Sequence, residues 1–217
     1  MILFRETVND LLWDILNKLM QIQELKTFRL VGGTSLSLML GHRKSVDIDL
    51  FTDAEYGSIN FNDIDEELKN SFRYVDYNMN LESSFGRSYF IGNSRNDTVK
   101  VDMFYTDSFA YPVLKIKNLR LSQLEEIIAM KFEVIGNNGR KKDFWDIHEL
   151  FGKFSVGQML SFYQKKYSYG YSREELIKKL TDFEMAESDL DPICLKGKYW
   201  ELIKLDIEEI LTNYASE

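Results

Sequence analysis

The sequence is poor in the residues that build cross-linked or metal-stapled folds. Its 217 residues include one cysteine, Cys194, which excludes an internal disulfide framework and a zinc cluster made of cysteines. Its two histidines, His42 and His148, are too few for a histidine metal cluster. Only two prolines interrupt the chain, and it has no internal repeat or low-complexity segment. These absences favour an ordinary globular fold.

Long apolar runs and net positive charge are also missing. The chain has no run of about 18 apolar residues, so no membrane span and no membrane partner are expected. Its first ten residues, M-I-L-F-R-E-T-V-N-D, lack the basic-then-apolar order of a signal peptide, which predicts a cytoplasmic protein. The net charge of −8 argues against general coating of nucleic acid. Lysine clusters with interleaved tyrosines near the C-terminal end leave a local RNA contact open.

The pattern of apolar residues indicates an α+β fold. We predict a small mixed sheet flanked by helices over residues 1–117 and a C-terminal helical bundle over residues 118–217. The expected strands cover residues 28–31, 47–51, 72–81, 87–92 and 98–105, and the expected helices include 3–22 and 121–135. Capping boxes are predicted where Ser122, Ser155 and Ser172 precede Glu125, Gln158 and Glu175.

A glycine turn follows the first predicted strand. Gly32 and Gly33 allow the backbone to approach a ligand closely, and Thr34 or Ser35 is expected to cap the helix that follows. The start of a helix collects free backbone N–H groups and favours anions, above all phosphate. The turn therefore predicts a phosphate cradle.

Two acids follow on the next predicted strand. Because side chains alternate along a strand, Asp47 and Asp49 point the same way, roughly 6.6 Å apart, while Ile48 and Leu50 point to the core. A phosphate cradle followed by two such carboxylates suits a divalent metal that holds a nucleoside triphosphate. The alternative is a solvated edge strand.

Four further residues leave two interpretations open. Asp102 lies in an apolar strand, where it faces either solvent or a ligand. Lys131 lies on the apolar stripe of a helix, where it either snorkels to solvent or serves a site. Asp143 and Asp146 either complement a helix macrodipole or belong to the same site.

Four motifs occur in a fixed order along residues 30–150: G-G-T-S-L, R-x-S-x-D-I-D-L-F, K-V-D-M-F, and a helical lysine followed by R-x-K-D-x-x-D. This order resembles the AbiEii/AbiGii-type nucleotidyltransferases of the polymerase-beta-like superfamily, a group that includes bacterial toxins. The chain departs from the superfamily in one respect, because Gly-Gly-Thr-Ser stands where Gly-Ser is common.

The resemblance implies a site. The triphosphate is held by the glycine turn and by polar residues before the acids: Gly32, Gly33, Thr34, Ser35, Arg43 and Ser45. Mg²⁺ or Mn²⁺ is bound by Asp47, Asp49 and Asp102. The later motif supplies Lys131, Asp143 and Asp146, in which the lysine neutralises phosphate charge and the acids orient it or contact the nucleotide.

The resemblance also implies a reaction. A nucleoside monophosphate (NMP) moves from an NTP to an acceptor with release of pyrophosphate, and Asp102 activates the acceptor hydroxyl. A toxin acting on tRNA 3′ ends, with a cognate antitoxin as partner, is the expected member. Two alternatives remain: nucleotidylation of a small molecule or protein hydroxyl, and a nucleotide-binding module without catalysis.

Overall fold

The computed structural model describes residues 2–77 and 85–216, and the chain divides into two compact units. The first comprises Met1–Leu40 with Ser45–Ser122, and the second Gly41–Lys44 with Gln123–Glu217. The sequence placed the boundary between residues 117 and 118. The chain instead leaves the first unit after Ser122, because the strand before it belongs to the sheet.

The first unit is built on a mixed sheet of seven strands, as the predicted α+β class requires. In spatial order the strands are β3-β4-β5-β2-β1-β7-β6. Their bounds are β1 Arg29–Leu30, β2 Asp47–Thr52, β3 Tyr74–Tyr77, β4 Gly86–Ser94, β5 Asp97–Tyr105, β6 Leu114–Ile116 and β7 Leu119–Leu121. Strand β2 runs parallel to β5 and antiparallel to β1.

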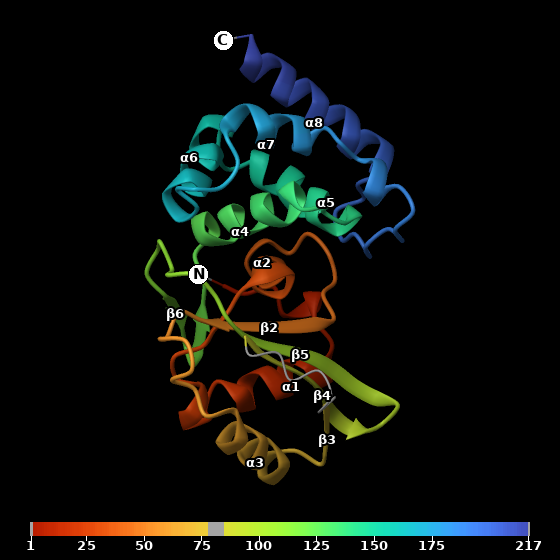
Figure 1. The fold of residues 1–217 in the computed structure, drawn as a ribbon. Coiled ribbons are helices and arrows are strands. Elements are labelled where there is room, and N and C mark those ends of the chain that lie inside the picture. The colour runs from red at the N-terminus through yellow and green to blue at the C-terminus, as the bar shows by residue number, and fades with distance from the viewer. Residues whose placement is uncertain (1, 78–84, 217) are drawn as a thin grey trace. The chain divides into compact units, whose positions relative to one another are not determined.

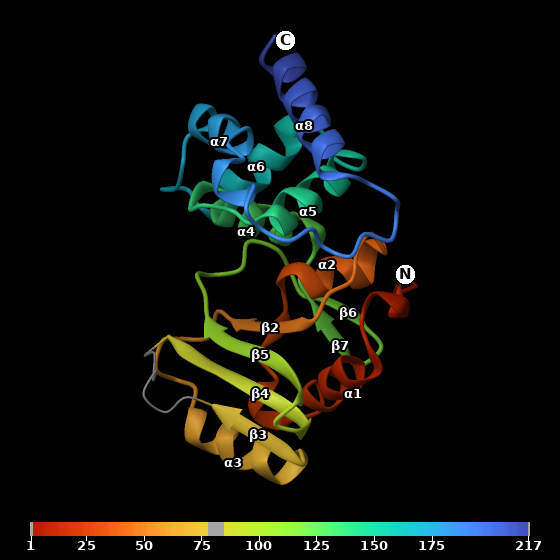
Figure 2. The same ribbon diagram turned by 90° about the vertical axis from the view of Figure 1, so that its right-hand side faces the viewer.

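Three helices cover the two faces of this sheet. They are α1 (Asp10–Leu19), α2 (Gly32–Leu40) and α3 (Phe61–Ser71). Figures 1 and 2 show α1 and α3 on one face and α2 on the other. The face toward α1 is the apolar core, because alternate residues of the central strands are fully buried there, among them Ile48, Leu50, Val101 and Met103.

Several predicted boundaries need correction. The helix expected over residues 3–22 is α1 alone, because the side chain of Asn9 caps it by accepting from the backbone N–H of Leu12 at 2.7 Å. A 3₁₀ turn, Arg5–Thr7, precedes it and another, Gln23–Leu25, follows it. The strand expected over residues 72–81 is β3, and residues 78–84 lie outside the described chain. Strands β6 and β7 were not predicted.

The second unit is helical. Its elements are α4 Leu124–Gly136, α5 Lys141–Phe151, α6 Val156–Lys166, α7 Arg173–Leu180, a 3₁₀ turn Glu184–Ala186, and α8 Trp200–Ala215. Aromatic rings fill its centre: Trp145 stacks with Trp200 at 6.4 Å between ring centroids, and Phe144 meets Phe183 at 5.1 Å. No helix in the described part of the chain is both long and apolar enough to cross a membrane.

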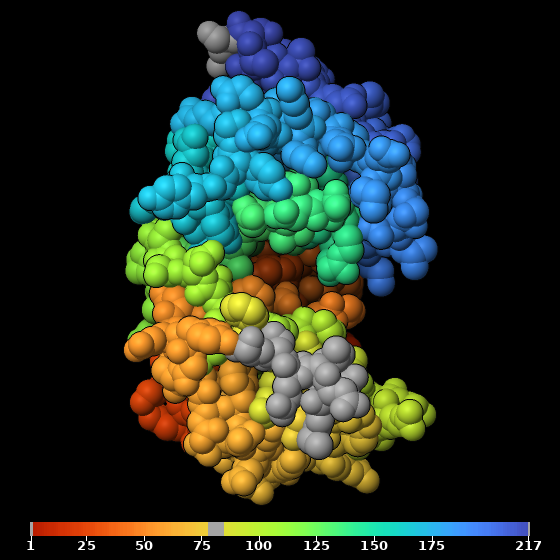
Figure 3. Space-filling view, in the orientation of Figure 1, coloured from red at the N-terminus to blue at the C-terminus, as the bar shows by residue number. Residues whose placement is uncertain are grey.

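The segment between α7 and α8 returns to the start of α5. Figure 3 shows its blue atoms beside those of α5. The backbone N–H of Lys141 donates to Asp189 at 3.0 Å, and the Lys141 ammonium pairs with Asp191, also at 3.0 Å. The segment is therefore held to α5 through both the backbone and the side chain of Lys141.

The predicted capping boxes have different outcomes. Those of Ser155 and Ser172 are both present. The box at Ser122 is wrong, because the backbone N–H of Ser122 donates to Leu30 and extends the sheet, so α4 begins two residues later. A strand hydrogen bond has displaced a local helix signal there.

Candidate active site

The three predicted metal-binding acids lie on one face of the sheet. Asp47 and Asp49 are two residues apart on β2, and Asp102 on β5 is the register partner of Asp49. Register partners share a face, so all three carboxylates lie on the face opposite the apolar core. Asp47, Asp49 and Asp102 are each half-buried. The alternative of a solvated edge strand is wrong, since β2 lies between β5 and β1.

Two residues that the sequence analysis missed contact Asp102. The hydroxyl of Ser88, its register partner on β4, donates to one carboxylate oxygen at 2.6 Å. The Lys100 ammonium donates to the other oxygen, also at 2.6 Å, and its side chain is 43% exposed. Lys100 stands two residues before Asp102 on the same strand. The alternation of side chains therefore predicts that it lies on the sheet face that carries Asp47, Asp49 and Asp102, which we call the acid face.

The glycine turn lies directly against the acids. Gly32 has φ of +65°, and a Cβ built there would collide with the Asp49 carboxylate. The backbone N–H of Val31 donates to the Asp49 carbonyl at 2.9 Å, which aligns the end of β1 with the acid pair. A glycine at this position therefore allows the start of α2 and the Asp49 carboxylate to occupy adjoining space.

The predicted cap of α2 is wrong. The helix begins at Gly32, so Thr34 and Ser35 lie inside its first turn. Thr34 is buried, its hydroxyl donates to the Asp47 carbonyl, and its oxygen lies 2.7 Å from that of Ser45. The Ser35 hydroxyl is fully buried and has no hydrogen-bond partner among the described residues. Gly32 and Gly33, by contrast, are half-exposed.

The acid face suits a hard cation by its donor chemistry. Carboxylate oxygens are the ligands that Mg²⁺ prefers, and the Lys100 ammonium already places one positive charge on Asp102. Within residues 2–77 and 85–216, no three His, Cys, Asp or Glu side chains are arranged around one metal position. The carboxylates are therefore suitable ligands for Mg²⁺, and in this structure one of them, Asp102, is paired with the Lys100 ammonium.

The later motif forms a buried ionic cluster within the second unit. Lys131 on α4 donates to Asp143 at 2.5 Å and lies 2.7 Å from Asp146. Arg43 grips both oxygens of Asp146, at 2.7 and 2.8 Å, and His42 Nε2 lies 2.7 Å from one of them. We define these five residues as the ionic cluster.

Burial and charge act against each other in the ionic cluster. Burial alone would favour a neutral Asp146, but the charges of Arg43 and Lys131 outweigh it and hold the pKa of Asp146 well below its usual range. Burial likewise opposes the charge of Lys131, but Asp143 and Asp146 raise its pKa above the usual value. Both groups are therefore charged. Lys131 is only 5% exposed, so the snorkelling alternative is wrong.

Asp143 has a second role at the start of α5. Its other carboxylate oxygen accepts from the backbone N–H of Arg140 at 2.9 Å, as an acid in the first turn of a helix commonly does. Asp143 thus fits both interpretations left open by the sequence. Asp146 lies a turn further along and is fully buried, so the macrodipole alone does not account for it.

Residues 41–44 carry His42 and Arg43 into the cluster. Arg43 pairs with Cys194 as an antiparallel bridge, and the backbone N–H groups of Lys44 and Leu195 donate to Ile193 and His42 at 2.9 Å. His42 was not predicted to belong to a site, because two histidines are too few for a metal cluster. Its role as a partner of Asp146 depends on this pairing with a segment 150 residues away, which no local pattern signals.

Several lysines of the basic clusters near the C-terminal end form ion pairs. Lys166 pairs with Glu126 at 2.8 Å with both side chains buried, and Lys198 pairs with Glu149 at 2.7 Å. Tyr163 is buried and its hydroxyl donates to Glu133, and burial raises the pKa of Tyr163. These contacts weaken the case for an RNA surface there.

Comparisons with known proteins identify a family and several relatives of this chain. A family profile described as "Nucleotidyl transferase AbiEii toxin, Type IV TA system" matches residues 14–209. A protein of Aquifex aeolicus (strain VF5) with no assigned function is 27% identical over 92% of this chain and 96% of its own length.

Two solved structures share the fold. One is a Helicobacter pylori protein assigned as a nucleotidyltransferase, with a TM-score of 0.58 and 18% identity over 93% of this chain and 90% of its own. The other is MenT4, a nucleotidyltransferase toxin from Mycobacterium tuberculosis, with a TM-score of 0.56 and 12% identity over 90% of this chain and 83% of its own.

Proposed function

We propose that this chain, which belongs to the AbiEii family of type IV toxin–antitoxin nucleotidyltransferases, transfers an NMP from an NTP to the 3′ end of a tRNA with Mg²⁺ or Mn²⁺ as cofactor. The observation that carries the proposal is the register of Asp49 with Asp102, on the same face as Asp47 and next to the turn at Gly32. The residues proposed to bind the phosphates, to bind the metal and to activate the acceptor are therefore neighbours within one unit.

The three acids would hold the metal. Asp47, Asp49 and Asp102 supply hard oxygen ligands, and a bound Mg²⁺ would supply charge stabilisation for an in-line displacement. Asp102 is also the acid that would accept the proton of the acceptor hydroxyl. Ser88 donates to this carboxylate and would orient it, and the Lys100 ammonium would compete with the metal for it.

The glycine turn would hold the triphosphate through its backbone. Gly32 and Gly33 are accessible, whereas the hydroxyls of Thr34 and Ser35 are buried. We therefore assign the phosphate contact to backbone N–H groups at the start of α2. Thr34 and Ser45 would act by fixing α2 to the carbonyl of Asp47.

The ionic cluster supports a positioning role. Arg43 and Lys131 carry two positive charges and Asp143 and Asp146 two negative ones, so these four side chains together offer no net charge to a phosphate. It does fix residues 41–44, which continue along the chain into Ser45. We propose that Arg43, Lys131, Asp143 and Asp146 act through this segment rather than by contact with nucleotide.

A cognate antitoxin follows from the family, and an RNA acceptor is the further step that we propose. The test is incubation of the full chain with each of the four α-labelled NTPs, Mg²⁺ and total RNA. We expect label in RNA of tRNA size, lost in Asp49→Asn and kept in the matched control Asp97→Asn, an exposed acid on β5. Label in protein or in a small molecule would show that the acceptor is not RNA. No label with any acceptor would contradict the proposal.

A further inference from the structure

The acid face carries a row of aromatic side chains next to the acids. Phe51 follows Asp49 by two residues on β2, Phe104 follows Asp102 by two on β5, and the two phenylalanines are register partners. All four side chains therefore lie on one face, with about 6.6 Å between the acid row and the aromatic row. The rings meet edge to face, with centroids 6.2 Å apart and planes at 72°.

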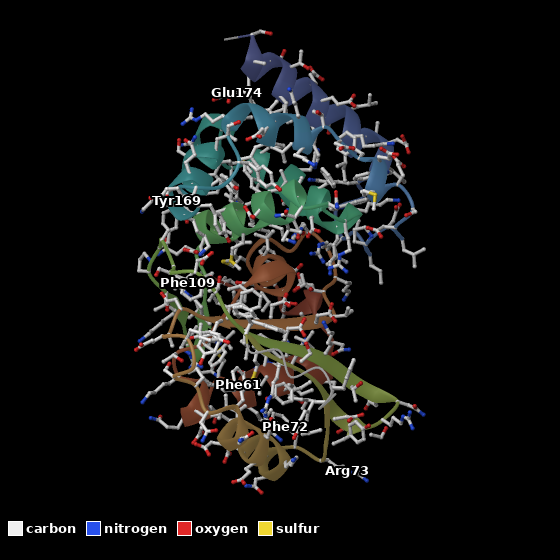
Figure 4. The ribbon with its side chains drawn as sticks, in the orientation of Figure 1. Phe61, Phe72, Arg73, Phe109, Tyr169 and Glu174 are labelled. Atoms are coloured by element: carbon white, nitrogen blue, oxygen red, sulfur yellow. The ribbon has the colours of Figure 1, made fainter. Side chains whose placement is uncertain are left out.

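The two ends of this row differ. On β4 the register partner of Phe104 is Gly86, where a Cβ would collide with the Phe104 ring. On β1 the register partner of Phe51 is Arg29, whose guanidinium stacks on the ring of Phe109 with 3.1 Å between Cζ and the ring centroid. Figure 4 labels Phe109 on the first unit. The absence of a side chain at Gly86 leaves room for the Phe104 ring. At the Phe51 end, the Arg29 guanidinium is held in place by its stacking on Phe109.

A cross-strand aromatic pair also stabilises a sheet, so packing must be weighed against binding. Packing alone would place the rings on the apolar face, where Leu50 and Met103 are at most 1% exposed. Phe51 and Phe104 instead remain half-buried on the polar face, in line with the acids. That position leaves part of each ring accessible beside the carboxylates.

We infer that Phe51 and Phe104 form a stacking site for an unpaired nucleobase of the substrate. The inference rests on the proposed function, since the base must belong to a nucleotide whose reacting group lies at the acids. Aromatic rings stack on any base, because every base presents a π-face. The base can come from the NTP or from the terminal nucleotide of the acceptor, and the two sources are separated by experiment.

The experiment measures binding without turnover, using the full chain with Mg²⁺. Four probes are compared: ATP, inorganic tripolyphosphate, a short single-stranded RNA, and the same RNA made abasic at its 3′-terminal nucleotide. We expect Phe104→Leu to weaken one base-containing probe about 5- to 150-fold, the range set by stacking on one base. The matching base-free probe should be unaffected. Loss with ATP assigns the site to the NTP, and loss with RNA assigns it to the acceptor.

Two further variants separate stacking from packing. Phe104→Trp keeps a π-face, so it should bind the affected probe as tightly as wild type. Tyr169→Leu, at a fully exposed aromatic position of the second unit, should change nothing (Figure 4). If Phe104→Leu fails to fold, the same comparison is made with Phe51→Leu, and weaker binding by a folded Phe104→Trp would count against stacking.

The inference is overturned if Phe104→Leu binds both base-containing probes like wild type, or if it weakens base-containing and base-free probes equally. Its failure is distinguishable from failure of the proposed function. Active transfer with no effect of the aromatic variants removes only the stacking site. Base-dependent binding through Phe104 without transfer of any NMP removes only the reaction.

Discussion

Replacing Asp146 by Asn removes one charge from the ionic cluster and almost no volume. The fully buried carboxylate receives His42 Nε2, two guanidinium nitrogens of Arg43 and the Lys131 ammonium, all within 2.8 Å. An Asn amide presents one oxygen, which accepts, and one NH₂ group, which only donates. The NH₂ group would therefore face the N–H donors that now bind one of the carboxylate oxygens. The substitution leaves Arg43 and Lys131 with Asp143 as their one remaining carboxylate in the cluster.

The expected cost follows from burial. Breaking a buried ion pair by removal of one partner typically costs about 3–5 kcal/mol, because the remaining charge stays buried without compensation. In a chain of this size a change of 1 kcal/mol shifts Tm by about 2–4 °C, so Asp146→Asn should lower Tm by about 6–20 °C. Lys131→Met should be destabilising for the same reason.

A double variant tests the origin of the cost. Lys131→Met combined with Asp146→Asn removes one charge of each sign, so its destabilisation should be smaller than the sum of the two single changes by about 0.5–3 kcal/mol. Asp206→Asn is the control, because Asp206 is 55% exposed and its pair with His148 contributes at most about 1 kcal/mol.

The assay is urea and thermal unfolding at neutral pH. A loss of under about 1 kcal/mol in Asp146→Asn would refute the argument, since it would equal the worth of an exposed pair. Strict additivity of the two single changes would refute it as well, because it would mean that the buried charges do not interact.

The pKa shifts also set the pH range of the effect. Asp146 has a lowered pKa, so its contribution is present above its ordinary value of 3.8 and is lost as the pH falls through the lowered folded value. Lys131 has a raised pKa, so its contribution is present below 10.5 and is lost as the pH rises through the raised folded value. Neither of these two shifts predicts a change between about pH 5 and 9 in the stability difference between wild type and Asp146→Asn, so a change in that range would come from another titratable group in contact with Asp146.

Three further predictions concern the acid face. Asp49→Asn should abolish NMP transfer while Tm changes by no more than in the control Asp97→Asn, because a half-buried acid contributes little to the core. Gly32→Ala should lose at least about 1 kcal/mol of stability, from strain at positive φ, and most of the thermal shift given by NTP and Mg²⁺, because its Cβ meets Asp49; an unchanged shift would contradict the cradle. Lys100→Met should lower the Mg²⁺ concentration for half-maximal activity by up to about fivefold, since the exposed ammonium that competes for Asp102 is worth at most about 1 kcal/mol; a higher requirement would show that Lys100 assists the metal.

Local periodicity accounts for the parts of the site that were predictable. The shared face of Asp47 and Asp49 follows from the two-residue repeat of a strand, and the capping boxes of Ser155 and Ser172 lie within four residues of sequence. The pairing of Asp49 with Asp102 across adjacent strands required the parallel register of β2 and β5, which are separated in sequence by an α-helix and two strands. The order of the motifs predicted this pairing through the resemblance to the family. The spacing of residues along the sequence did not predict it.

The errors arise where a tertiary hydrogen bond outweighs a local one. Ser122 and Glu125 match a capping box, yet the backbone N–H of Ser122 donates to Leu30 and keeps the residue in the sheet. The stripe of α4 located Lys131 correctly, but Arg43, which pairs with the same Asp146, comes from residues 41–44. A helical pattern predicts which face a lysine occupies and is silent about a guanidinium ninety residues away.

The two groups of acids differ in burial, and this difference separates their roles. In the ionic cluster Asp143 and Asp146 are matched by Lys131 and Arg43, and the pKa shifts of Asp146 and Lys131 keep that balance through neutral pH. On the sheet face the carboxylates are half-buried, and the ammonium that pairs with Asp102 belongs to Lys100, whose side chain is 43% exposed. A buried, balanced group holds the chain in place, whereas half-buried carboxylates with an exposed partner can exchange that partner for a divalent cation. The sheet face is therefore where metal removal should stop the reaction, and the ionic cluster is where mutation should first be felt as lost stability.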